Sequence, residues 1–193
     1  MKKINLLLIF IWSVLTISAQ ETLNNSEYTF KEVQEYESNL GSVLAHTYPY
    51  EEGQTRTFIF DRENDRFILR LHAWYTFDED LNELIEIEYN WGLYNPGFNA
   101  DKNLDLLQKL VKKEKKFRRK FKKVHKDLQK KYGPETNNEI MWDGPLSFGQ
   151  TITWDLDDKK ITLHITFTRQ LKEIPEIGWA ANFFRISQEI EFK

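Results

Sequence analysis

The chain contains no cysteine among its 193 residues. This absence excludes disulfide bonds, thiolate metal sites and lipid attachment at a cysteine. Glycine and proline are also scarce, at 8 and 5 residues, which argues against a disordered or linker-rich array. A domain without disulfides has to be stabilised by hydrophobic burial, and the 14 Phe, 8 Tyr and 6 Trp residues suit that role.

Long apolar runs are absent except at the start of the chain. Residues 4–17 are apolar apart from two hydroxyl residues and one asparagine, and they follow the cations Lys2 and Lys3. The run is shorter than the roughly 20 residues of a membrane span, and small residues follow it, as in a secretory signal peptide. We therefore expect a signal peptide over 1–19, export to the periplasm or outside the cell, and a single α+β domain over 20–193 without a transmembrane span.

The first half of this domain combines helical and strand periodicity. The apolar spacing predicts a helix over 28–40, with Ser26 as its N-cap and Gly41 at its end. Alternation of apolar and polar residues then predicts three strands, the first two joined by a charged turn over 61–65. These strands are expected at 57–60, 67–75 and 85–91.

The second half begins with a strong helical pattern over 101–132 that stops at Gly133. Alternation then predicts strands over 151–156, 161–168 and 180–192. We therefore expect an α+β fold in which an antiparallel sheet is packed by one long amphipathic helix.

The two halves have the same order of elements. The hairpins align without a gap at an offset of 94 residues, which places Phe60 on Trp154 and Leu69 on Leu163. This indicates tandem α-β-β-β repeats over 26–98 and 99–193 that share a sheet. The alternative is that all antiparallel hairpins share this alternation. The element order resembles that of the tandem-repeat secreted β-lactamase inhibitor proteins and their outer-membrane assembly relatives; this resemblance includes no residue motif and implies no function.

Charge is distributed very unevenly along the chain. Residues 101–132 contain 14 basic and 4 acidic side chains, a net charge of +10. The expected mature chain has 25 basic and 30 acidic residues, so the remainder carries −15. The basic face is either a solvated helix surface or a contact for an anionic lipid or glycan. The candidate contact residues are Lys112, Lys115, Lys116, Arg118, Arg119, Lys122 and Lys123.

Nucleic acid is a less favoured partner for this helix. Base stacking requires exposed aromatic side chains, whereas Phe117 and Phe121 lie on the apolar stripe that we expect to be buried. Export from the cell lowers the expectation further.

Motifs for catalysis and metal binding are also missing. No serine stands in a Gly-x-Ser-x-Gly turn, and the four histidines lack the spacing of metal ligands within a helix. His72 and His164 fall on the second strands of the two hairpins, so they would converge only if the halves packed face to face. We expect no catalytic residue, metal ligand or cofactor, and no carboxylate pair stands out from the others.

The tryptophans divide into core and surface candidates. Trp91 and Trp154 lie at apolar positions of strands and are expected in the core. Trp74 shares a strand face with polar residues, and Trp142 lies in a turn-like stretch, so both are candidates for recognition. We expect a non-catalytic interaction module for an unknown protein or envelope component. The alternatives are a carboxylate-based hydrolase of envelope glycans and a carrier of lipids or small ligands.

Overall fold

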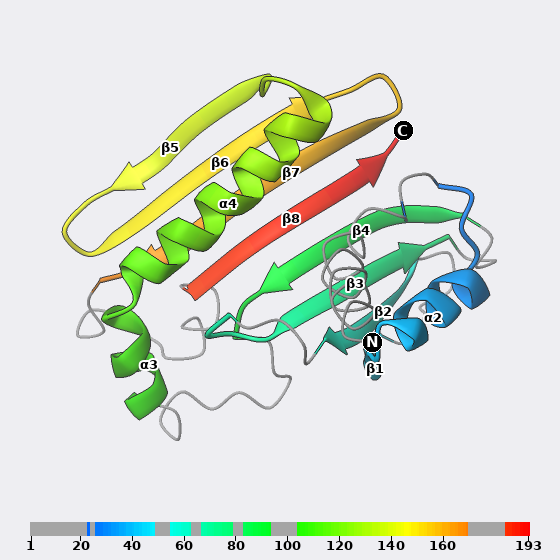
Figure 1. Ribbon diagram of the computed structural model, residues 1–193, viewed down its shortest axis with the longest axis horizontal. Helices are drawn as coiled ribbons and strands as arrows, with labels where there is room; N and C mark the ends of the chain where they lie inside the picture. The colour runs from blue at the N-terminus through cyan, green and yellow to red at the C-terminus, as the bar shows by residue number, and fades with distance from the viewer. Residues whose placement is uncertain are drawn as a thin grey trace, which may run out of the picture.

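The computed structural model describes residue 23 and residues 26–48, 55–62, 67–78, 83–93, 104–169 and 184–193. The expected signal peptide, residues 1–19, lies outside them. The described residues form an antiparallel sheet of eight strands with helices, which confirms the α+β class (Figure 1). The elements, in chain order, are α2 (Phe30–Asn39), β1 (Val43–Thr47), β2 (Arg56–Arg62), β3 (Leu71–Phe77), β4 (Leu84–Trp91), α3 (Leu104–Val111), α4 (Glu114–Tyr132), β5 (Asn137–Asp143), β6 (Ser147–Asp155), β7 (Lys159–Thr168) and β8 (Phe184–Phe192).

The strand order across the sheet is β1-β2-β3-β4-β8-β7-β6-β5. Each half of the chain therefore forms a four-stranded meander, and the last strands of the two meanders pair at the centre. Figure 1 shows α2 over the β1–β2 side of the sheet and α4 along β6, β7 and β8. The prediction that one long helix packs the sheet is therefore wrong, because α2 and α4 cover different halves.

Helix α2 begins later than the sequence predicts. Thr29, not Ser26, is the N-cap, because the Thr29 side chain accepts a hydrogen bond from the Glu32 N–H and Glu32 accepts one from the Thr29 N–H. This reciprocal capping box satisfies two N–H groups that would otherwise be unpaired at the helix start. The expected end at Gly41 is confirmed, since Gly41 has φ 72°, a conformation that favours glycine.

The single helix predicted over 101–132 is two helices, α3 and α4. The backbone leaves the helical region at Lys113, with φ −110° and ψ 10°. Residues 112–116 are all charged, so this stretch has no apolar side chain that could pack a continuous helix against the sheet. Figure 1 shows α3 inclined to the axis of α4 at the end of the sheet.

Both edge strands were missing from the sequence prediction. All seven residues of β5 are exposed, and β1 is mostly exposed, so neither strand has the alternation that marks a half-buried strand. Strand β2 also runs through Asp61 and Arg62, which were predicted to form a turn. Conversely, 67–69 lie before β3 rather than within it.

The core lies between the sheet and the helices and is rich in aromatic rings. Trp91 and Trp154 are fully buried, as expected. Phe117 of α4 contacts the rings of Phe167 and Phe184, at centroid distances of 5.3 and 6.2 Å. On the other half of the sheet, Phe30 of α2 stacks on Phe58 at 3.9 Å. Aromatic burial therefore attaches each helix to its own meander.

A buried ion pair also joins α2 to the sheet. Arg62 of β2 donates its Nε to Glu37 Oε2 at 3.0 Å, and a second guanidinium nitrogen and the Tyr75 hydroxyl both donate to Glu37 Oε1. Ser42 donates to the same carboxylate. The Glu37 side chain is fully buried and that of Arg62 is 9% exposed, so each charge depends on the other for compensation.

The ladder registers contradict the ungapped alignment of the two halves. Phe60 pairs with Ala73, so an offset of 94 residues would pair Trp154 with Phe167. Trp154 instead pairs with Ile161. The reason is the length of the connection, because residues 63–70 join β2 to β3 whereas only 156–158 join β6 to β7.

Replacing Arg62 by Met should lower the free energy of unfolding by about 3 kcal/mol, because the buried Glu37 carboxylate loses its counter-charge. The matched control Lys193→Met removes a cation that pairs with Asp155 at the surface, and it should cost less than about 1 kcal/mol. Urea unfolding measures both values. Equal losses for the two variants would contradict a dependence of α2 docking on this pair.

Candidate functional site

The two faces of the sheet differ in what covers them. α2 and α4 contact β2, β3, β7 and β8 through side chains of one face. The alternate residues of the same strands lie on the opposite face. We term it the helix-free face, since the contacts of α2 and α4 with described residues of the sheet lie on the other side. Candidate functional side chains occur on both faces and are described in turn.

A row of polar residues crosses the helix-free face along one line of strand pairing. Successive ladders pair His72 with Asn90, Asn90 with Ser187, and Ser187 with His164. Each histidine is hydrogen-bonded at the outer end of this row: His72 Nδ1 lies 2.6 Å from Asp61 Oδ1, and His164 Nδ1 lies 2.8 Å from the Thr151 hydroxyl. We term the row Asp61, His72, Asn90, Ser187, His164 and Thr151 the polar row.

The two histidines do not converge on one site. They occupy β3 and β7, which are separated by β4 and β8, so about 14 Å of sheet lies between them. His72, Asn90 and Ser187 are nonetheless at most 6% exposed. Burial, together with the charge of Arg185, lowers the pKa of His164. A neutral His164 is therefore favoured at neutral pH.

Four carboxylates lie beside the polar row at the centre of the sheet. Glu86 and Glu88 of β4 are paired across the ladder with Glu191 and Glu189 of β8, respectively. We term these four residues the central carboxylates. Two cations compensate them in part: Arg185 pairs with Glu88, and Lys160 Nζ lies 3.4 Å from Glu191 Oε2. Like charges directly opposite each other destabilise a sheet, so this arrangement lowers the stability of the central ladder.

The central carboxylates have perturbed proton affinities. Burial, followed by the charges of Glu189 and Glu88, raises the pKa of Glu86 to about 7. Burial and the charges of Glu88 and Glu191 raise the pKa of Glu189. Perturbed acids of this kind gather at functional sites more often than elsewhere, although structural networks also produce them.

Aromatic side chains flank this region at the β1 end of the sheet. The Trp74 ring lies 6.2 Å from the Tyr48 ring, and the Tyr48 ring packs edge-on against His46 at 4.9 Å. Ile59, paired with Trp74 in the ladder, is fully buried beside these rings. Trp74 is also directly opposite Glu88, so the predicted recognition residue lies next to the central carboxylates.

The second predicted recognition residue, Trp142, lies at the other end of the same face. It belongs to strand β5, not to a turn, and is 38% exposed. Its ring covers Gly149 so closely that a Cβ atom at that glycine would lie 2.4 Å from the ring. Gly149 therefore provides the space in which Trp142 rests on the sheet.

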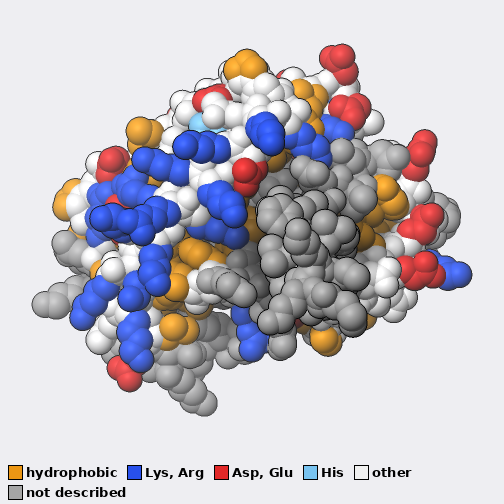
Figure 2. Space-filling model, viewed as in Figure 1, with side chains coloured by type: hydrophobic (Ala, Val, Ile, Leu, Met, Phe, Trp, Pro, Cys, Tyr) orange, Lys and Arg blue, Asp and Glu red, His pale blue; other side chains and the backbone are white. Residues whose placement is uncertain are grey.

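The basic side chains predicted on the long helix gather on the opposite, helix-covered side of the molecule. Figure 2 shows Lys and Arg side chains concentrated over α4 with few acidic groups among them. Phe117, Phe121, Val124 and Leu128 are buried against the sheet, so the cations take the remaining helix surface. Within the described ranges no ion pair links Lys115, Arg119 or Lys122 to a carboxylate.

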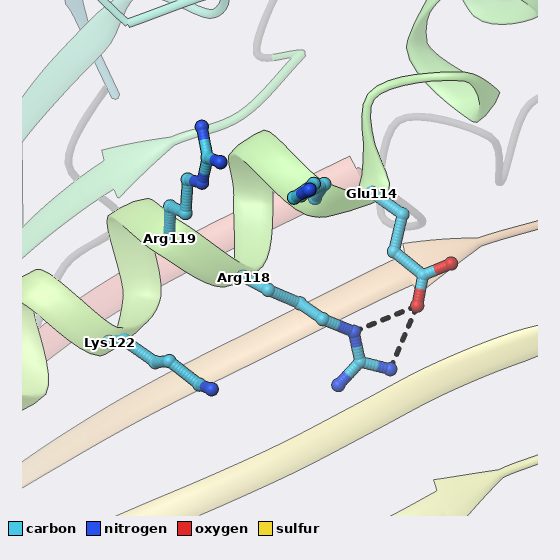
Figure 3. A pocket seen from close by; sticks show the side chains of 5 residues that line it. Glu114, Arg118, Arg119 and Lys122 are labelled. Atoms are coloured by element: carbon cyan, nitrogen blue, oxygen red, sulfur yellow. Dashed lines mark hydrogen bonds and ion pairs between the residues drawn. The ribbon is translucent and has the colours of Figure 1, made fainter.

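Four of the seven predicted cations line one pocket. A cavity of about 570 Å³ is bounded by Glu114, Lys115, Arg118, Arg119 and Lys122, and we term it the basic pocket (Figure 3). Lys112, Lys116 and Lys123 are exposed but do not line it. The sequence located these cations, but the pocket itself and the central carboxylates depend on how the strands and helices pack.

No group of three or more potential ligands is placed to hold a metal ion among the residues with described positions. The described helices also include none that is long and apolar enough to cross a membrane.

Comparisons with protein-family models, curated proteins and solved structures give no match.

Replacing Glu86 by Gln should stabilise the protein above neutral pH. The pKa of Glu86 is about 7 in the folded protein and 4.5 ordinarily. Between these pH values the folded protein keeps a proton that the unfolded chain has released. The free energy of unfolding therefore falls as the pH rises from 4.5 through 7. We expect a gain of about 1 kcal/mol at pH 8, after allowing for solvent screening of a half-exposed group, and a smaller gain at pH 5. Urea unfolding at both pH values measures it.

The control is Glu139→Gln, which removes an exposed carboxylate from β5. Its effect on the free energy of unfolding should be small and the same at both pH values. A gain for Glu86→Gln that is the same at pH 5 and pH 8 would contradict the proton linkage.

Proposed function

We propose that the protein is an exported, non-catalytic interaction module that binds a protein partner through the helix-free face. The observation that carries this proposal is the one-sided packing of α2 and α4, which leaves the opposite face of the eight-stranded sheet to polar and aromatic side chains. Rigid sheet faces with aromatic anchors are well suited to recognition, since few side-chain rotamers are frozen on binding.

The chemistry of this face favours a basic partner. The central carboxylates outnumber Arg185 and Lys160, the cations that pair with them. A Lys or Arg side chain from a partner would offset the repulsion between Glu86 and Glu189 and favour their ionised forms. Trp74, beside Glu88, would supply the apolar contact that a recognition hot spot needs.

The two alternative functions have weaker support. A hydrolase would use the perturbed Glu86 as its acid, but the pocket lined by described residues, the basic pocket, lies on the other side of the sheet. A carrier requires a large apolar cavity, whereas the basic pocket is lined by charged side chains.

Export is part of the proposal and rests on the sequence of residues 1–19. Signal-peptide cleavage after Ala19 would leave a mature chain that begins at Gln20. Mass spectrometry of the intact exported protein measures its first residue directly. A protein retained at full length inside the cell would refute export.

We also propose that the halves 26–98 and 99–193 descend from one duplicated unit, whose two hairpins align only when a gap is introduced into the sequence alignment. In both halves a helix precedes a four-stranded meander, and the helix ends near a glycine of positive φ, Gly41 or Gly133. The last strands of the meanders pair symmetrically at the sheet centre. An experimental structure whose halves cannot be superposed by one rotation would remove this proposal.

Site-specific photo-crosslinking tests the binding face. A photoreactive residue at Thr162, on the helix-free face of β7, should capture a basic partner in envelope extract at low salt and lose it at high salt. The same residue at Asp127, on the exposed side of α4, is the control and should not capture it. Equal capture from both positions, or none from Thr162, would contradict the proposal. Once the partner is purified, Trp74→Ala should weaken its binding about tenfold or more.

A further inference from the structure

The cations of the basic pocket share one stripe of α4. Arg118, Arg119 and Lys122 lie three, four and seven residues after Lys115, so the four cations occupy neighbouring turns within a sector of about 100° of the helix surface. Figure 3 shows Arg118 and Lys122 on one side of the helix and Arg119 on the other, so the pocket spans the outward surface of the helix between them. Like charges at this spacing destabilise a helix unless a counter-ion lies between them.

The single acid of the pocket is already compensated. Glu114 Oε1 accepts hydrogen bonds from Arg118 Nε at 2.8 Å and from Arg169 at 2.9 Å, and Glu114 Oε2 accepts one from Arg169 Nε at 3.1 Å. These bonds, chiefly those from Arg169, lower the pKa of Glu114. Glu114 therefore does not neutralise Lys115, Arg119 or Lys122.

The same contacts fix one wall of the pocket. The Arg118 guanidinium lies over the Phe148 ring at 3.7 Å while it is bonded to Glu114. Arg169 also reaches Asp143 Oδ1 at 3.0 Å, and so ties the start of α4 to the end of β5. A cation held in place by stacking and hydrogen bonds loses less entropy when a ligand binds.

The central carboxylates do not neutralise the basic pocket. The central carboxylates lie on the helix-free face, whereas α4 packs on the opposite face of the sheet. At physiological ionic strength, screening reduces interactions between solvent-exposed charges separated by more than about 8 Å. Glu114 is the one acidic side chain among the described residues that line the pocket, so an external anion can supply the missing counter-charge.

We propose that the basic pocket binds a phosphate group. A phosphate presents up to two negative charges and several acceptor oxygens, which match the forked guanidinium of Arg119 and the ammonium groups of Lys115 and Lys122. A carboxylate would offer only one charge. Phe117 and Phe121 are buried, so the stripe presents no ring for stacking a nucleic-acid base. The phosphate is carried either by a lipid headgroup or by a soluble phosphate compound.

Two probes distinguish these sources, inorganic pyrophosphate in calorimetry and phosphatidylglycerol vesicles in co-sedimentation, with phosphatidylcholine vesicles as the neutral comparison. The pocket variant combines Lys115→Gln, Arg119→Gln and Lys122→Gln. The matched control combines Lys123→Gln, Lys126→Gln and Lys130→Gln, which removes three exposed charges from the same helix outside the pocket. Glutamine is a good helix former, and circular dichroism verifies that both variants stay folded.

We expect the pocket variant to bind at least one probe about tenfold or more weakly, and the control to change binding by less than about threefold. Loss with pyrophosphate identifies a soluble phosphate ligand, and loss with vesicles alone identifies a lipid headgroup. Equal losses in the two variants would overturn the proposal, because they would show diffuse attraction to a basic helix. Absence of binding to both probes at low salt would also overturn the proposal.

Discussion

The pairing of β4 with β8 is the constraint on which the rest of the structure depends. It joins two meanders that would otherwise be separate four-stranded sheets, and it places the C-terminal strand at the centre. The same ladder sets Glu88 opposite Glu189 and Asn90 opposite Ser187. The central carboxylates and the middle of the polar row therefore exist only because this pairing forms. The apolar side chains on the other face of β4 and β8, such as Ile87 and Ile190, are buried and offset the charge repulsion.

The sheet also separates the opposite charges of the chain. α4 is strongly basic on its exposed surface, and the central carboxylates lie on the other face of the sheet. A chain of modest net charge, −3, thus presents two surfaces of opposite sign. The two interactions proposed above, with a basic protein partner on the helix-free face and with a phosphate group at α4, would therefore use separate surfaces. Screening between exposed charges of the two faces allows each to bind without neutralising the other.

Strong periodicity of apolar residues predicted the central strands. Where this periodicity is absent, the sequence failed to predict the element. β4, β6 and β7 were found because their side chains alternate between a buried face and a more exposed one. β5 is exposed along its whole length, so backbone pairing with β6 is what makes it a strand. The break between α3 and α4 escaped the helical pattern because charged residues at 112–116 retain helix propensity but provide no contact with the core. Trp142 was predicted to lie in a turn because the exposed residues of β5 around it lack the alternation of a half-buried strand.

The sequence by itself determined the α+β class, the aromatic core and the positions of Trp91, Trp154 and the basic stripe, because these follow from local periodicity and composition. Tertiary structure alone decided which strands are neighbours, and hence that His72 and His164 lie in one row without meeting. It also decided that Arg62 is buried against Glu37, and that Arg169 secures the basic pocket across 55 residues of sequence. Pairing between distant segments depends on the summed burial of the whole sheet, which no single stretch of sequence encodes.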